Sequence, residues 1–120
     1  MRNIACLLSG LLIIFVLLAG TSCFSREYKG QLILVNNSNE LITVGRIEVC
    51  NQLIEIKNIR SHEKSVGTFK VTGDCHYDVA INFASGKELR KQLGYVTHGF
   101  DFQHTLTVTE TDITIDNSHG

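Results

Sequence analysis

A chain of 120 residues with eleven Lys and Arg against twelve Asp and Glu is close to neutral, with a formal charge of −1. This balance gives no reason to expect a nucleic-acid partner, and the length favours one domain. The chain contains no tryptophan, so the Cys–Trp–Cys signature of immunoglobulin domains is absent. It also contains no proline, so sheet edges must be protected by charge, bulges or short strands.

The first 22 residues have the three parts of a secretory signal peptide. Arg2 supplies a positive start, residues 4–19 carry no charge, and the small residues GTS follow. The apolar run is short compared with the about 20 residues that span a bilayer comfortably. We therefore favour cleavage after residue 22 over an uncleaved membrane anchor. The mature chain loses Arg2 and keeps ten basic against twelve acidic residues, a formal charge of −2.

The four cysteines have different predicted fates. Cys6 lies in the apolar run and leaves with it, whereas Cys23 follows the predicted cleavage point. Cys50 and Cys75 remain in the exported domain, where an even pair in an oxidising compartment favours a disulfide. Their wide separation, without CxxC spacing, argues against a redox or zinc pair. We predict a structural disulfide.

The segment AGTSC resembles the lipobox of bacterial lipoproteins. In that family small residues precede an invariant cysteine, which receives diacylglycerol on its thiol before the chain is cut in front of it. Thr21 and Ser22 fit the small positions, whereas Gly20 stands where an aliphatic residue is usual. The resemblance covers residues 1–23 and implies a lipid anchor.

Ordinary signal-peptidase cleavage near the same place is the alternative. It would leave Cys23 as an unpaired thiol in an oxidising compartment, whereas lipidation accounts for every cysteine in the chain. We therefore predict that Cys23 attaches lipid and makes the membrane one partner. By the same resemblance, Phe24 stands where inner-membrane lipoproteins commonly carry Asp, which implies an outer-membrane protein facing the bacterial periplasm.

Signals typical of β-strands fill the chain after a short polar tether at residues 23–30. No longer window keeps an apolar period of 3.6 residues, and apolar runs or alternating residues recur between turn clusters. In CHYDVAINF the odd positions from Cys75 to Phe83 share one face. The predicted strands are 31–35, 41–50, 53–59, 66–72, 75–83, 104–110 and 112–116.

Two segments are irregular. The parity of apolar residues changes across Gly45 and Arg46, as a β-bulge would allow. Residues 88–100 fit either a strand broken at Gly94 or a short helical turn. The whole pattern predicts an all-β fold, a small antiparallel β-sandwich or small barrel of about six to eight strands over residues 31–116, with a tail at 117–120.

No set of residues has the pattern of a catalytic site. Ser85 lies in a turn rather than a GxSxG elbow, and the adjacency of Ser61, His62 and Glu63 does not make a triad. We expect neither enzymatic activity nor a cofactor.

Residues 98–104 carry the strongest candidate metal ligands. His98, Asp101 and His104 could hold Zn²⁺ or Cu²⁺ if a turn at Gly99 brought them together. The spacing matches no motif of known geometry, so we expect solvent-facing histidines and no metal.

The segment GYVTHGFDF is rich in aromatic residues and glycine. Aromatic side chains on such a loop at one end of a sandwich are typical of recognition surfaces, although a role in capping the core fits equally well. We predict a partner-binding surface with Tyr95 and Phe100 as anchors, Asp101 as the polar contact and Phe102 beside them.

Size, anchor and the lack of a catalytic pattern favour a protein that binds another envelope or secreted protein, as an inhibitor or immunity-type lipoprotein does. A structural or assembly accessory of an envelope complex is the alternative. A metal-handling lipoprotein ranks third.

Overall fold

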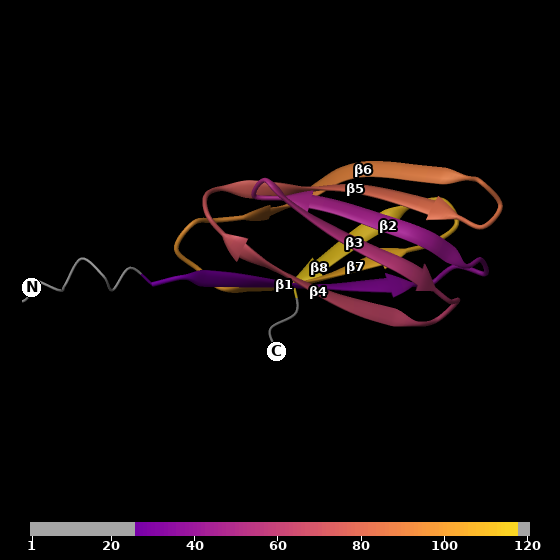
Figure 1. Ribbon diagram of the computed structural model, residues 1–120, viewed down its shortest axis with the longest axis horizontal. Coiled ribbons are helices and arrows are strands. Elements are labelled where there is room, and N and C mark those ends of the chain that lie inside the picture. Colours follow the sequence, from indigo (N-terminus) through magenta and orange to yellow (C-terminus); the bar gives the residue numbers. More distant parts are fainter. Residues whose placement is uncertain (1–25, 118–120) are drawn as a thin grey trace, which may run out of the picture.

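The computed structural model describes residues 26–117, which form eight β-strands in two four-stranded sheets packed face to face (Figure 1). The strands are β1 Tyr28–Asn36, β2 Ile42–Val49, β3 Gln52–Ile59, β4 Lys64–Val71, β5 Cys75–Phe83, β6 Glu88–Val96, β7 Phe102–Val108 and β8 Ile113–Asn117. The predicted all-β sandwich is confirmed. The predicted signal peptide, Cys23 and residues 118–120 of the predicted tail lie outside the described residues.

The core lies between the sheets and is built from alternate positions of their strands. In β5 the side chains of Tyr77, Val79, Ile81 and Phe83 are buried, whereas Asp78, between the first two, is exposed. This confirms the face predicted from the alternation. Within residues 26–117, no helix is long and apolar enough to cross a membrane.

The first sheet has the strand order β4-β1-β7-β8 and the second β3-β2-β5-β6. All pairings among the described strands are antiparallel except that of β1 with β7, which is parallel, with Gly30 opposite Phe102 and Asn36 opposite Val108. The alternation of residues did not predict this mixed sheet. Because β1 and β7 run in the same direction, the residues that precede each strand meet at one end of the sandwich (Figure 1).

β6 is a continuous strand with a bulge, and not a helical turn. Tyr77 pairs with Leu93 and Cys75 with Val96, so both Gly94 and the residue after it lie opposite one residue of β5. Gly94 has a φ of +74°, and a Cβ atom there would lie 2.6 Å from a side-chain carbon of Ile115. Only glycine fits this position without displacing the core.

The second bulge lies earlier in β2 than predicted. The register against β5 shifts between Ile42 and Val44, and not across Gly45 and Arg46. From Gly45 onward the strand alternates regularly, with Gly45 and Ile47 buried and Arg46 exposed. Thr43 is therefore the extra residue, and Gly45 takes an inward position in contact distance of Leu34.

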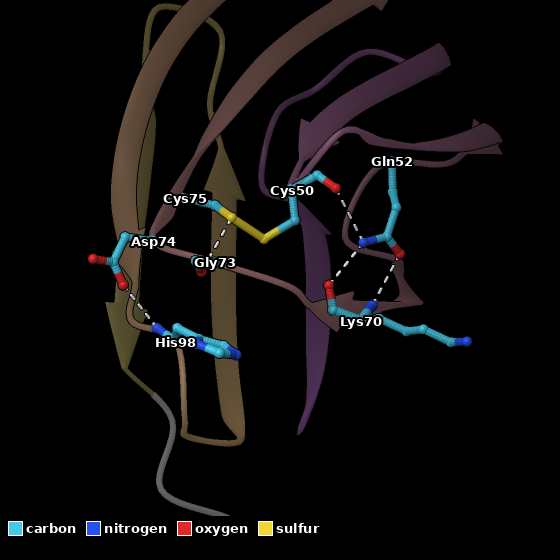
Figure 2. The surroundings of a disulfide bond; sticks show 7 residues. All are labelled: Cys50, Gln52, Lys70, Gly73, Asp74, Cys75 and His98. Carbon is cyan, nitrogen blue, oxygen red and sulfur yellow. Dashed lines mark hydrogen bonds between the residues drawn. A yellow bond between two sulfur atoms is a disulfide. The ribbon is translucent and has the colours of Figure 1, made fainter. Parts of the chain in front are cut away.

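A disulfide joins Cys50, in the turn after β2, to Cys75, the first residue of the neighbouring strand β5, which confirms the predicted pair (Figure 2). The S–S distance is 2.08 Å and the Cα atoms are 5.4 Å apart. Cys50 and Asn51 form the two-residue turn between β2 and β3, and both have positive φ, 50° and 58°. These values match a type I′ turn, which suits the twist of a β-hairpin.

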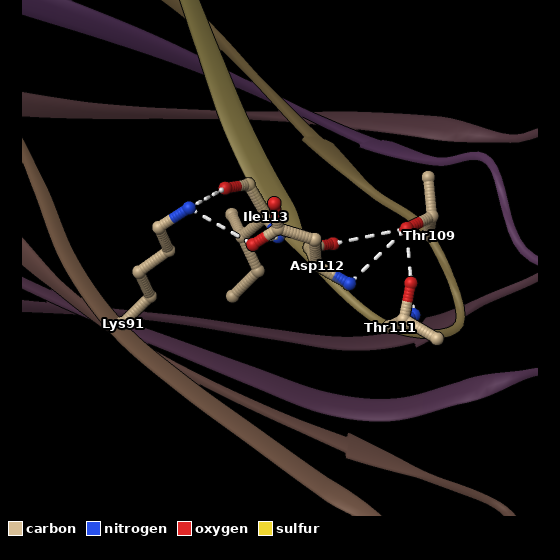
Figure 3. A network of polar contacts seen from close by, with 5 residues as sticks. All are labelled: Lys91, Thr109, Thr111, Asp112 and Ile113. Atoms are coloured by element: carbon tan, nitrogen blue, oxygen red, sulfur yellow. Dashed lines mark hydrogen bonds and ion pairs between the residues drawn. The ribbon is translucent and has the colours of Figure 1, made fainter.

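Side chains from the two edge strands of the second sheet, β3 and β6, form hydrogen bonds to the first sheet. The Gln52 amide donates to the carbonyl of Lys70 at 2.7 Å and accepts from its N–H at 2.9 Å, which links β3 to β4 (Figure 2). Lys91 of β6 donates to the Asp112 carboxylate and to the Ile113 carbonyl, each at 2.9 Å, just where β8 begins (Figure 3). The bond from Lys91 holds the pKa of Asp112 below its usual value.

Candidate functional site

The loop between β6 and β7, residues 97–101, is fixed at both ends by carboxylates. Asp74 accepts a hydrogen bond from the His98 N–H at 2.9 Å (Figure 2). Asp101 accepts one from the Lys29 N–H at 2.9 Å and one from Nη2 of Arg26 at 3.0 Å. Asp101, predicted as a polar contact for a partner, therefore uses both carboxylate oxygens within its own chain.

Aromatic rings form a row from this loop into the core. Phe100 is 60 % exposed, and its ring meets Phe102 edge-on at 6.4 Å. Phe102 is half-buried against the core and stacks on the buried His104 at 5.4 Å. Nδ1 of His104 lies 2.6 Å from the Tyr77 hydroxyl, to which it is hydrogen-bonded. Phe100 thus lies on the surface, whereas Phe102 caps the core.

Burial changes the acidity of Tyr77 in this row. Its side chain is fully buried, and burial raises the pKa of the Tyr77 hydroxyl well above its usual value. The hydroxyl therefore stays protonated and keeps its hydrogen bond with His104.

The three candidate metal ligands are held in different contacts. His98 is exposed, with its ring edge-on to Tyr28 at 6.4 Å, and Asp101 pairs with Arg26. His104 is buried, contrary to the expectation of solvent-facing histidines, because it occupies an inward position of β7. In the described part of the chain, no three His, Cys, Asp or Glu side chains are grouped to hold a metal ion.

The adjacent Ser61, His62 and Glu63 also fail to converge. The Ser61 hydroxyl donates to the carbonyl of Ser38 at 2.5 Å, and the Glu63 carboxylate accepts from the Arg60 N–H at 3.0 Å. These contacts hold the turn between β3 and β4, so the local sequence serves the fold.

Tyr95 belongs to a different surface from Phe100. It lies in the β6 bulge opposite His76 and is 59 % exposed. No ring contact among residues 26–117 joins Tyr95 to Phe100 or Phe102. The predicted surface is therefore divided, with Tyr95 on the second sheet and Phe100 on the end loop.

Outward residues of the second sheet form two rows across all four strands. We call these rows, together with the exposed Tyr95 in the β6 bulge, the outer face. The first row is Leu53, Glu48, Asp78 and Gln92, and the second is Glu55, Arg46, Ala80 and Arg90. A shallow groove of about 460 Å³ lies over both rows. The small Ala80 side chain lies between the two arginines, and the exposed Leu53 lies on the groove's edge.

Both arginines of the outer face form ion pairs that remain accessible to solvent. Nε of Arg46 lies 2.9 Å from Glu55, and Nε of Arg90 lies 3.2 Å from Glu88. The Gln92 amide donates to Asp78 at 3.0 Å. Exposed ion pairs of this kind contribute about 0–1 kcal/mol, so a partner can replace them at little cost.

Sequence reasoning missed Leu53, Arg46 and Arg90 as members of one surface. Leu53 and Arg46 occupy outward positions of predicted strands, whereas Arg90 lies in the segment 88–100 that fitted either a strand or a helical turn. Outward residues of this kind are the available signal. Their adjacency depends on the pairing of β2 with both β3 and β5, which alternation does not reveal.

The sequence matches no protein-family model and no curated protein. Among solved structures, it is similar to the NMR structure of a protein from Eubacterium rectale, with a TM-score of 0.55 and 15 % identity over 77 % of this chain and 90 % of that one. This likeness supports the fold alone. A disulfide-locked mutant of intermedilysin, solved with human CD59, aligns at 12 % identity and a TM-score of 0.37 over 75 % of this chain and 24 % of that chain.

Proposed function

We propose that this chain is a lipid-anchored protein of the bacterial envelope that binds another protein, in the manner of an inhibitor or immunity protein. The outer face is its contact surface. The observation that carries the proposal is the presence of two large exposed apolar side chains, Tyr95 and Leu53, on the sheet that holds the groove over Ala80. Binding energy concentrates in large side chains that can be fully desolvated on contact.

The groove has the chemistry of a protein contact. Ala80 leaves room for a partner side chain between Arg46 and Arg90, and guanidinium groups are enriched where interfaces bind tightly. The neighbouring row presents Glu48 and Asp78. A partner with an acidic side chain over Ala80 and basic groups beside it would be complementary, and such complementarity selects partners and speeds association.

The disulfide supports an exported location. Disulfides persist in oxidising compartments such as the periplasm, and the amino-terminal sequence has the pattern of an export signal ending at Cys23. Both features agree with a domain held at the envelope membrane by lipid on Cys23.

Differential capture from an envelope extract tests the proposal. The lipidated protein is held in bilayer discs, and bound proteins are quantified for the wild type, Tyr95→Ala and Leu53→Ala. Phe100→Ala is the matched control, because Phe100 is 60 % exposed compared with 59 % for Tyr95 but lies outside the outer face. We expect one partner whose affinity falls about thirtyfold with Tyr95→Ala, a loss of about 2 kcal/mol, and is unchanged with Phe100→Ala.

Equal retention by the wild type and Tyr95→Ala would refute the outer face as the contact. Loss of the partner with Phe100→Ala, but not with Tyr95→Ala, would assign binding to the end loop instead. Far-ultraviolet circular dichroism of each variant checks that strand content is unchanged.

A further inference from the structure

The chain enters the sandwich at the end that carries the loop of residues 97–101 (Figure 1). Arg26 is bonded directly to Asp101 of this loop, at 3.0 Å. Cys23 precedes Arg26 by three residues, which span at most about 11 Å when extended. Lipid on Cys23 would therefore hold the loop close to the bilayer surface.

Phe100 is presented outward by contacts within the protein. The Asp74 and Asp101 carboxylates fix the backbone on either side of it, and Phe102 supports its ring edge-on. Gly99, with a φ of +98°, has open space around its Cα. The ring is thus prearranged for a contact outside the chain, and ordering it on binding costs little conformational entropy.

The charges at this end are largely neutralised by pairs. Arg26 pairs with Asp101 and stacks over the ring of Tyr28 at 4.9 Å, and Lys70 lies 3.4 Å from Glu27. A contact centred on Phe100 is therefore apolar and needs no anionic lipid.

We infer that Phe100 inserts into the headgroup boundary of the bilayer and holds the sandwich upright on the membrane. This inference rests on the proposed lipid anchor at Cys23. Phenylalanine is among the residues that bury in this boundary, and the anchor makes the contact intramolecular, so one ring suffices. β1 has nine residues and extends for about 30 Å away from the loop and the bilayer. The outer face is therefore left facing the periplasm.

Depth-dependent fluorescence quenching tests the inference, because the chain contains no tryptophan. Phe100→Trp places a single indole on the loop. Val66→Trp is the control, because Val66 is 51 % exposed and pairs with Ile33, about 17 Å along β1 from Tyr28. Lipidated full-length protein is extracted from membranes, its acyl mass is verified, and it is placed in palmitoyloleoyl-phosphatidylcholine vesicles with and without lipid brominated on the acyl chains.

We expect brominated lipid to reduce the emission of the Phe100→Trp variant about twofold and to leave the Val66→Trp variant unchanged, because only the loop reaches the boundary. Equal quenching of the two variants, or none in either, would overturn the inference while the verified acyl mass left the anchor intact. Lack of acyl mass would overturn the anchor and this inference with it.

Discussion

Removal of the Cys50–Cys75 disulfide should destabilise the domain by about 3.5 kcal/mol. The bond closes a loop with a sequence separation of 25, and the chain-entropy model assigns such a loop about 12 cal/mol/K of lost freedom in the unfolded chain. At 25 °C this corresponds to about 3.5 kcal/mol. A domain of this size would then melt about 15–25 °C lower. Urea unfolding of Cys50→Ala/Cys75→Ala, followed by circular dichroism, measures the loss.

A second variant separates the covalent effect from the backbone effect. Cys50 has a φ of 50°, a conformation that costs residues with a Cβ atom about 1–2 kcal/mol and costs glycine little. Cys50→Gly/Cys75→Ala should therefore be about 1 kcal/mol more stable than Cys50→Ala/Cys75→Ala. A loss below about 1 kcal/mol in the double-alanine variant would refute the reasoning that the bond restrains the unfolded chain. Wild-type protein treated with a reductant is the control.

Three further predictions concern stability. Gly94→Ala should lower the free energy of unfolding by more than about 2 kcal/mol, because Gly94 has a φ of +74° and an added Cβ atom would clash with the core. Gly73→Ala, where a Cβ atom meets open space, should lower it by less than about 1 kcal/mol. Urea unfolding measures both. Tyr77→Phe should lose about 1–2 kcal/mol at neutral pH with its buried hydrogen bond. Because burial raises the pKa of Tyr77, its contribution to folding stability is complete below pH 10.0, the usual pKa of tyrosine, and is lost as the pH rises further. Tyr77→Phe should therefore lack the wild type's loss of stability at alkaline pH. A backbone hydrogen bond from Asn39 lowers the pKa of Glu110, and the hydrogen bond from Lys91 lowers that of Asp112. The contribution of each carboxylate to folding stability should therefore be complete above pH 4.5 and be lost as the pH falls through the lowered pKa. The melting temperatures of Glu110→Gln and Asp112→Asn should fall less steeply with acid than that of the wild type.

Local patterns predicted the features that depend on local geometry. The alternation from Cys75 to Phe83 identified the buried face of β5, because successive side chains of a strand point to opposite faces. The pairing of Cys50 with Cys75 followed from the export signal and the small number of cysteines. Neither prediction required knowledge of which strands are neighbours.

Features set by strand pairing were not predicted. The parallel pairing of β1 with β7 brings Arg26 and Lys29 to Asp101, and no local signal indicates that this carboxylate is already bonded. His104 could have been placed inward, because it shares its phase in β7 with Phe102 and Leu106, both packed into the core.

The division of the predicted surface has a physical cause in β6. The bulge at Gly94 places Tyr95 on the exposed side of the second sheet, whereas Phe100 follows Gly99 into the loop toward the first sheet. Closeness in sequence therefore did not imply a common surface. Tyr95 shares its sheet with Leu53, which is distant in sequence.

Photo-crosslinking in the bacterial envelope tests the central claim most directly. The photoreactive residue p-benzoylphenylalanine replaces Tyr95 in one strain and Phe100 in another, and adducts of the lipidated protein are resolved by mass. A protein adduct of one defined mass from position 95, with none at position 100, is the predicted result. A protein adduct from position 100 with none at position 95 would contradict both the outer face as the contact surface and the membrane as the partner of Phe100.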